Sequence, residues 1–442
     1  MEPKITVIVP SFNVAPYIGK CLDSILTQTL SEIEVFVVDA YSTDGTREII
    51  EEYVKKDDRL TLLDDIKKST GYSKNIAIDK ANAPYYAIVE SDDYIEPDMF
   101  EKMYAIANST GVDFVKANFS TFLGEDDRRY DFPKTVALNG DDYEKIINPQ
   151  EYPECFRWIM FEWLGLYRVD FLKEHNIRHN ESPGAAFQDT GFWFQTFAFA
   201  TSVYLMRDSF YHYRCDNPYA SVKDPKKVLN ICREYEYIFS RLKTCESVWN
   251  RVKSQYCRGF FYDNYVVFNR ISEELKPELV SVMQDVLKNM LAEGGDLNML
   301  EDAEREKAEC LLNSQEGFLI AEQKLDEERR DNEKQLLGVL DSRENTFIYG
   351  AGSYGANLQY YLDYKGYSIK AFVDGDSKKH GEKLNGKEII SLSEVVATYK
   401  RPYFLVANKD HSKEIYETLI NHGIPECDIF ICDMTKYVKT LI

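Results

Sequence analysis

The sequence predicts an α/β protein with an N-terminal doubly wound sheet, a helical middle region and a small C-terminal domain. Three observations lead to this prediction. Strand patterns alternate with helix patterns over residues 1–115, helix patterns fill residues 225–343, and a strand, a glycine-rich turn and a helix restart at residue 345. The length of 442 residues suits about three domains. We expect these to be residues 1–222, 223–343 and 344–442.

Four strand patterns lie in the first 115 residues. Residues 5–9 are a run rich in β-branched side chains, typical of a strand buried on both faces, and further strands are expected at residues 34–38, 59–63 and 85–89. Amphipathic segments between them predict helices at residues 17–28 and 42–56. Strands joined by helices are expected to be parallel, which places ligands beyond the carboxyl ends of the strands.

The segments that follow are less regular or mostly helical. Residues 116–222 are irregular and rich in aromatic side chains, and we expect Trp158, Trp163 and Trp193 to be core residues; stacking on a sugar ring is the alternative. Residues 298–343 are acidic and nearly free of Gly and Pro, which predicts a long helical connector. We also expect a homo-oligomer formed through residues 225–343.

Composition excludes several classes of function. A net charge of −21 argues against a nucleic-acid binder and against docking on anionic lipid. Nine cysteines without a Cys-x-x-Cys pair predict free thiols in a reducing compartment. No signal peptide and no transmembrane segment is expected. We therefore expect a cytoplasmic protein, either free or peripheral at the inner face of the membrane.

Four segments at expected strand ends combine polar and charged residues. They are Pro10-Ser11-Phe12-Asn13, residues 39–45, residues 71–75 and Glu90-Ser91-Asp92-Asp93. The acids Glu90, Asp92 and Asp93 repel one another unless a cation neutralises them, and their oxygens suit Mg²⁺ or Mn²⁺. Such a cation can bridge the two phosphates of a nucleotide. The alternative for the cluster alone is a solvated acidic loop.

Residues 1–222 resemble a family 2 glycosyltransferase of the GT-A fold. The resemblance is carried by Pro-Ser-Phe-Asn at 10–13, Val-Val-Asp at 37–39 with Ser-Thr-Asp-Gly-Thr at 42–46, Glu-Ser-Asp-Asp at 90–93, Trp-Leu-Gly-Leu-Tyr-Arg at 163–168, Phe-Gln-Asp-Thr at 187–190, and His-Tyr-Arg at 212–214 with Ser221. It implies donor-binding roles for Pro10, Ser11, Phe12, Asn13, Asp39, Lys74, Asp92 and Arg214, metal binding by Glu90, Asp92 and Asp93, and a general base at Asp189.

Three residues depart from the family pattern. Ala40 replaces a second Asp that commonly contacts uracil, which weakens the expectation of a uridine donor. Lys74 replaces an Arg and loses the two-pronged grip on phosphate. Glu90 replaces the first Asp of the acidic motif and is longer by one methylene.

These residues predict a metal-dependent, inverting glycosyltransferase. It would move a sugar from a nucleotide-sugar, first of all a UDP-sugar, to a glycan or to a lipid- or protein-linked acceptor in polysaccharide biosynthesis. Asp189 would take the proton of the acceptor hydroxyl, and its apolar neighbours favour a raised pKa. A helix-capping Asp is the structural alternative. The alternative function is a nucleotide-sugar- or glycan-binding regulator that has lost transfer activity.

A second glycine-rich turn lies in the C-terminal domain. Gly350, Gly352 and Gly355 follow a strand and open a helix, and Asp374 ends the next strand, where a ribose hydroxyl would be bound. The segment resembles the small Rossmann-like domain of sugar-modifying acetyltransferases, also fused to some bacterial glycosyltransferases. A second nucleotide site, a structural or oligomerising remnant, and a second catalytic activity all remain open.

Overall fold

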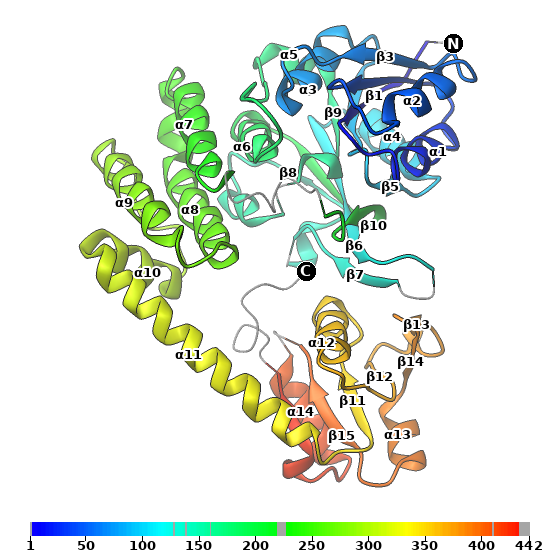
Figure 1. Ribbon diagram of the computed structural model, residues 1–442, viewed down its shortest axis with the longest axis vertical. Helices are drawn as coiled ribbons and strands as arrows, with labels where there is room; N and C mark the ends of the chain where they lie inside the picture. The colour runs from blue at the N-terminus through cyan, green and yellow to red at the C-terminus, as the bar shows by residue number, and fades with distance from the viewer. Residues whose placement is uncertain are drawn as a thin grey trace. The chain divides into compact units, whose positions relative to one another are not determined.

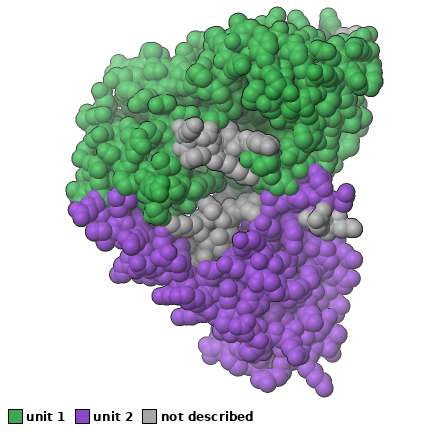
Figure 2. Space-filling view, viewed as in Figure 1, with its two compact units in different colours: residues 1–120, 135–315 green, residues 121–134, 316–442 purple. Residues whose placement is uncertain are grey.

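The computed structural model describes residues 2–126, 129–137, 139–159, 161–218, 227–408 and 411–432. The chain divides into two compact units (Figure 2). The first comprises residues 1–120 and 135–315, and the second comprises residues 121–134 and 316–442. The second unit therefore includes a short insert from the N-terminal half of the sequence.

A ten-stranded mixed sheet organises the N-terminal half of the chain (Figure 1). Its main path runs β3-β2-β1-β4-β9-β6-β10-β5, with β7 beside β6 and β8 beside β10. The strands are β1 Ile5–Ser11, β2 Ile33–Asp39, β3 Leu60–Asp64, β4 Tyr85–Ile88, β5 Tyr94–Ile95, β6 Phe114–Leu123, β7 Tyr130–Lys134, β8 Ile146–Ile147, β9 Gly165–Arg168 and β10 Val203–Arg214. The predicted α/β fold class is confirmed.

The strand order creates a switch point between β1 and β4. Strand β1 is parallel to β2, from Ile5 opposite Ile33 to Ser11 opposite Asp39, and it is parallel to β4 on its other side. The chain runs outward from β1 to β3 and then returns to β4, so the connections diverge at this point. In open α/β sheets, ligands bind at such a point beyond the carboxyl ends of the strands.

Helices α1 to α6 pack beside the strands. Their bounds are α1 Ile18–Leu26, α2 Thr46–Val54, α3 Thr70–Lys80, α4 Met99–Thr110, α5 Val169–Glu174 and α6 Gln188–Phe199. Helix α1 illustrates why these segments are helical, because its apolar residues recur every three or four positions and Ile18, Leu22 and Ile25 are fully buried. Helix α2 begins at Thr46, and the Thr46 amide donates a hydrogen bond to the Asp44 side chain at 3.1 Å, which satisfies one of the free amides at the start of the helix.

Two long strands, β6 and β10, lie in the segment predicted to be irregular, so that prediction was wrong for them. The first nine residues of β6 are all buried, including Lys116, Asn118 and Ser120. Buried polar residues remove the apolar run by which a central strand is recognised. The aromatic residues of this segment are core, as expected, since Trp158, Trp163 and Trp193 are all less than 5% exposed.

Five helices form the middle region, which confirms its helical character. They are α7 Asn230–Leu242, α8 Glu246–Arg270, α9 Lys276–Ala292, α10 Asp302–Asn313 and α11 Gln315–Leu340. The predicted long connector is two helices, because Ser314 has an extended backbone between α10 and α11. Self-association through this region stays a prediction.

The second unit has its own six-stranded sheet in the order β13-β14-β12-β11-β15-β16. Its elements are β11 Thr346–Tyr349, α12 Ser353–Tyr364, β12 Phe372–Val373, β13 Lys383–Leu384, β14 Lys387–Ile390, α13 Leu392–Thr398, β15 Tyr403–Val406, α14 Ser412–Asn421 and β16 Ile429–Ile431. The insert of residues 121–134 belongs to this unit because Tyr130 donates to Asp363 at 3.1 Å and the Asp131 amide donates to Asn385 at 2.7 Å.

All nine cysteines are free, and five of them are buried. Within the residues that the structure describes, no helix is both long enough and apolar enough to cross a membrane.

Candidate active site

The ends of β1 and β2 form one hydrogen-bonded corner. The Asn13 amide donates to the Ser42 hydroxyl at 2.9 Å, and the Thr43 amide donates to the Asn13 side-chain oxygen at 2.9 Å. The Ser42 hydroxyl donates to the buried Asp39 carboxylate at 2.5 Å, and Arg47 pairs with the same carboxylate at 3.1 Å. Two segments that are about 30 positions apart in the sequence therefore make one rigid corner.

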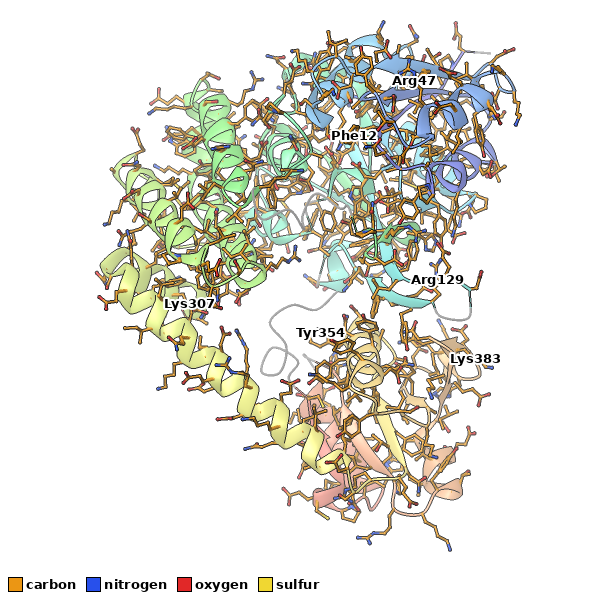
Figure 3. All side chains as sticks on the ribbon, in the orientation of Figure 1. Phe12, Arg47, Arg129, Lys307, Tyr354 and Lys383 are labelled. Carbon is orange, nitrogen blue, oxygen red and sulfur yellow. The ribbon has the colours of Figure 1, made fainter. Side chains whose placement is uncertain are left out.

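Residues 10–12 present an aromatic ring and a polar group at this corner. Phe12 directly follows β1, and its side chain is 55% exposed (Figure 3). The Ser11 hydroxyl is buried and has no hydrogen-bond partner among the described residues, while Pro10 is buried in the strand. An exposed ring can stack on a planar base. The buried Ala40 methyl group offers no hydrogen bond to such a base.

The three acids after β4 are bound to different elements. Glu90 pairs with Lys74 of α3 at 2.8 Å, and Asp92 accepts a hydrogen bond from Asn217 at 2.8 Å. Asp93 is buried, and its two oxygens accept from the Tyr211 hydroxyl at 2.9 Å and from the Arg214 amide at 2.7 Å. The acidic segment is thereby held between α3 and β10.

The acids are electrostatically unfavourable as they stand. Burial raises the pKa of Asp93 well above its usual value, and the neighbouring Asp92 charge raises it further. Burial also raises the pKa of Asp92 and, despite the nearby Lys74 ammonium, that of Glu90. Each group gains from a further positive charge beside it.

Glu90 and Asp92 suit a cation whose remaining ligands would come from the phosphates of a substrate. Among the described residues, Glu90 accepts a side-chain hydrogen bond from Lys74 alone, and Asp92 accepts one from Asn217 and one from its own backbone amide, whereas the two oxygens of Asp93 accept from Tyr211 and Arg214. Among the described residues, no three His, Cys, Asp or Glu side chains are arranged to hold a metal together. Mg²⁺ is commonly bound by one or two carboxylates together with substrate phosphates, and Glu90 and Asp92 fit that pattern.

A buried charge network lies behind the acids, and sequence reasoning missed it. Lys74 is 3% exposed, and its ammonium also pairs with the fully buried Glu162. His179 Nε2 lies 2.5 Å from the other Glu162 oxygen and donates to it; burial lowers the pKa of His179, although the Glu162 charge acts in the opposite direction. Although burial alone would raise it, the charges of Lys74 and His179 lower the pKa of Glu162 to about 2.

The network changes the expectation for Lys74. Burial alone would lower the pKa of Lys74, but the charges of Glu162 and Glu90 raise it above its usual value. Its ammonium is engaged by two carboxylates, so donor binding by Lys74 stays a prediction that requires one of these pairs to open. A buried Lys in a motif needs an acidic partner, and Glu162 beside the Trp163 motif was the available signal.

Lys116 of β6 is a second buried lysine in this part of the fold. It is fully buried and donates to the Phe161 carbonyl at 2.9 Å. Burial lowers its pKa to about 7, although the charges of Glu162 and Asp189 act in the opposite direction. Its positive charge is therefore present in only part of the molecules near neutral pH.

Asp189 occupies the first turn of α6 and is partly exposed. Burial raises its pKa to about 6, and the Glu162 charge raises it further, while Lys74 acts in the opposite direction. The helix begins after Phe187, so Asp189 lies inside the helix and not at the N-cap position, but its carboxylate accepts backbone hydrogen bonds from Thr190 and from its own amide, which lower its pKa. A carboxylate with a pKa near 6 is suited to accept a proton at neutral pH.

Arg214, the last residue of β10, contacts the acidic segment. It is buried, its Nε donates to the Asp92 carbonyl at 3.1 Å, and its guanidinium lies 4.6 Å from the centre of the Tyr17 ring. Contact of Arg214 with a diphosphate stays a prediction. Ser221, the last residue of the matching motif, lies outside the described residues.

The C-terminal glycine turn has the expected backbone, but its acid is engaged. Gly350 has a positive φ of 116°, and a Cβ on Gly355 would lie 1.9 Å from the Gly350 carbonyl, whereas Gly352 has open space around it. Asp374 accepts from the Ala351 amide at 2.9 Å and pairs with Lys379 at 3.0 Å. Although burial acts against it, these donors and the Asp376 amide lower the pKa of Asp374. The Asp374 carboxylate thus supports the turn itself, and a second nucleotide site stays a prediction.

Two family models match the chain. Residues 6–174 match glycosyl transferase family 2, and residues 342–430 match the family described as C2185-like, N-terminal. The first match covers the corner, the acids, Lys74 and Glu162, but ends before α6.

Curated relatives and a solved structure are also similar. An uncharacterized glycosyltransferase, EpsJ, of Bacillus subtilis (strain 168) is 30% identical over 51% of this chain and 65% of its own length. TuaG of the same organism, named a putative teichuronic acid biosynthesis glycosyltransferase, is 26% identical over 56% of this chain and 93% of its own length. The crystal structure of S. aureus TarS 1-349 with UDP-GlcNAc is 19% identical, with a TM-score of 0.42 over 67% of this chain and 93% of that chain. The chain spans less than two thirds of the length of EpsJ.

Proposed function

We propose that the N-terminal half of the chain transfers a sugar from a nucleotide-activated donor to an acceptor hydroxyl. One observation carries the proposal. The partly exposed Asp189 carboxylate has a pKa raised to about 6 and interacts electrostatically with Glu162 and Lys74. Lys74 in turn pairs with Glu162 and with Glu90 of the acidic segment at the switch point. The match to glycosyl transferase family 2 supports the same reaction.

The residues divide into a donor side and an acceptor side. On the donor side, the exposed Phe12 ring would stack on the base, and the segment that includes Ser11 would line the ribose pocket. Glu90 and Asp92 would hold a divalent cation, which when bound neutralises charge on the diphosphate. On the acceptor side, Asp189 takes the proton of the attacking hydroxyl as the new bond forms. A single displacement of this kind inverts the anomeric carbon.

The acceptor is proposed from the relatives. One of them is named for teichuronic acid biosynthesis, which is consistent with a growing glycan on a carrier as acceptor. The alternative, a protein that binds donor without transfer, is favoured by the contacts of Asp93 and Lys74, since their charged groups are already engaged within the chain.

A ligand panel tests the proposal and separates it from the alternative. Melting temperature is measured with UDP, GDP, CDP and dTDP and with their sugars, in Mn²⁺ and in EDTA, because a ligand that binds the folded state stabilises it. The stabilising nucleotide-sugar is then assayed for release of the nucleoside diphosphate. Metal-dependent stabilisation with release supports the transferase, and stabilisation without release supports the binding protein.

A matched pair of variants makes the panel specific. Asp92→Asn should lose the metal-dependent part of the stabilisation. Asp98→Asn, at a 40% exposed side chain that pairs with Lys102, should behave like wild type. If no compound in the panel shifts the melting temperature, the proposed donor side is wrong.

A further inference from the structure

Helix α7 of the middle region places a buried carboxyl group against the helix that carries Asp189. Glu234 of α7 is 1% exposed. Its Oε2 accepts a hydrogen bond from the Asn180 side-chain amide at 2.9 Å, whereas its Oε1 is buried and has no hydrogen-bond partner among the described residues. A buried polar atom without a partner is costly, so its position calls for an explanation.

The unpartnered oxygen lies against the backbone of α6 at Gly191. A Cβ added to Gly191 would lie 1.9 Å from Glu234 Oε1 and 3.0 Å from its carboxyl carbon. Only a glycine therefore allows this approach. Since successive helical residues are turned by about 100°, Gly191 and Asp189 face nearly opposite sides of α6, and Glu234 supports this turn from behind.

The other oxygen of Glu234 is connected to the charge network of the site through Asn180 and His179. Its partner Asn180 follows His179, and the His179 amide and carbonyl are both hydrogen bonded to the Asn75 side chain at 3.0 Å. The His179 ring contacts Glu162, the partner of Lys74. Glu234 thus joins the first turn of α6 to the segment that holds the network in place.

We propose that Glu234 is a positioning residue that holds the first turn of α6, and with it the Asp189 carboxylate, at the acceptor side of the site. The inference rests on the proposed role of Asp189 as general base. It also assigns a function to the middle region, since α7 supplies part of the support of the site in addition to any role in linking the two units.

Burial and the negative neighbouring charges favour the neutral form of the Glu234 carboxyl group. Burial, together with the negative charges of Asp189 and Glu162, raises the pKa of Glu234 to about 8, although the hydrogen bond from Asn180 acts in the opposite direction. Tyr237 of α7 is also coupled to Glu234. Asp189 is also coupled to Lys74, Tyr213, Lys116 of β6 and the buried Asp263 of α8, and burial brings the pKa of both Lys116 and Asp263 to about 7. At pH 7 Glu234 is therefore mostly neutral, and above pH 8 it adds a negative charge behind α6.

The test follows the ionisation of Asp189 directly by carbon-13 NMR of the full chain labelled at the aspartate carboxyl carbon. The Asp189 signal is assigned by its absence in Asp189→Asn. In wild type we expect a midpoint near pH 6 and a second, smaller step near pH 8 as Glu234 ionises. Glu234→Gln keeps the shape and the neutral state, so the first midpoint should stay within about 0.3 unit and the second step should vanish.

Two further variants separate positioning from general stability. Glu234→Ala admits water behind α6 and should lower the Asp189 midpoint by about 0.5 unit or more. Asp263→Asn is the matched control, an acid-to-amide change at a buried carboxylate that accepts from Tyr235 at 2.6 Å, and it should leave the step near pH 8 intact.

A step near pH 8 that persists in Glu234→Gln, or that is missing in wild type, overturns the proposal even if Glu234→Ala does not fold. An unchanged Asp189 midpoint in a folded Glu234→Ala protein also overturns it. The readout involves no sugar transfer, so the proposed function can fail in the ligand panel while this coupling is observed, and the reverse is equally visible.

Discussion

Asp189→Asn keeps the size and shape of the side chain but removes its ability to accept a proton. The wild-type carboxylate has a pKa of about 6, because burial in the first turn of α6 disfavours its charge. At pH 7 a group with that pKa is ionised in about 90% of molecules. The wild-type protein is thus almost fully competent as a base near neutrality.

The expected loss is large because proton transfer is part of the chemical step. Removing a positioned base costs about 10²–10⁴ in rate, which corresponds to a barrier higher by about 3–5 kcal/mol. Donor binding should change little, since the proposed donor contacts lie at the ends of β1, β2 and β4 and do not involve α6. The variant should therefore lower the rate of transfer and leave donor affinity nearly intact.

The assay is single-turnover transfer from the nucleotide-sugar identified by the panel, measured from pH 5 to pH 8 beside donor affinity. The wild-type rate should rise through a midpoint near pH 6 and then level off, because the charged form is the active one. Asp189→Asn should lack this rise, and Asp98→Asn should retain it. A variant rate within about threefold of wild type, far below the expected cost, refutes the role of Asp189. Weakened donor binding with normal chemistry makes it a pocket residue instead.

Three further perturbations test other parts of the structure. Glu162→Gln should lower the free energy of unfolding at pH 7 by about 3–5 kcal/mol in urea titrations, because it removes the buried negative charge that Lys74 and His179 contact and leaves Lys74 with Glu90 as its ionic partner. The pKa of Glu162 is lowered to about 2, so the wild-type advantage should be full above about pH 4.5 and should shrink as the pH falls toward 2; a constant difference contradicts this. Asp93→Ala should reduce Mn²⁺-linked donor stabilisation by freeing Tyr211, and unchanged calorimetric binding would exclude Asp93 from the donor side. Gly355→Ala should lower the melting temperature of the second unit only, with diphosphate release within about twofold of wild type, since its Cβ would meet the Gly350 carbonyl; loss of release would link the glycine turn to the reaction.

Local patterns were enough to predict the parallel half of the sheet and the helical middle. Residues 5–9 and 34–38 form strands because continuous apolar runs are stable only where both faces are covered, and that requirement is visible in the residues themselves. The same patterns failed at β6, where Lys116 is fully buried within the strand. Its burial depends on residues far away in the sequence.

The functional residues divide in the same way. The sequence alone determined which polar segments end the parallel strands, since strand direction follows from the alternation of strands and helices, and so it brought Pro10–Asn13, Asp39 and the acids after β4 to one edge. Only the tertiary structure decided which charges meet. Lys74 lies 88 positions from Glu162, and Glu234 reaches the turn of Asp189 from a separate helix. The physical reason is that pKa shifts arise from burial and from charges a few ångströms away, and neither quantity can be read from spacing along the chain.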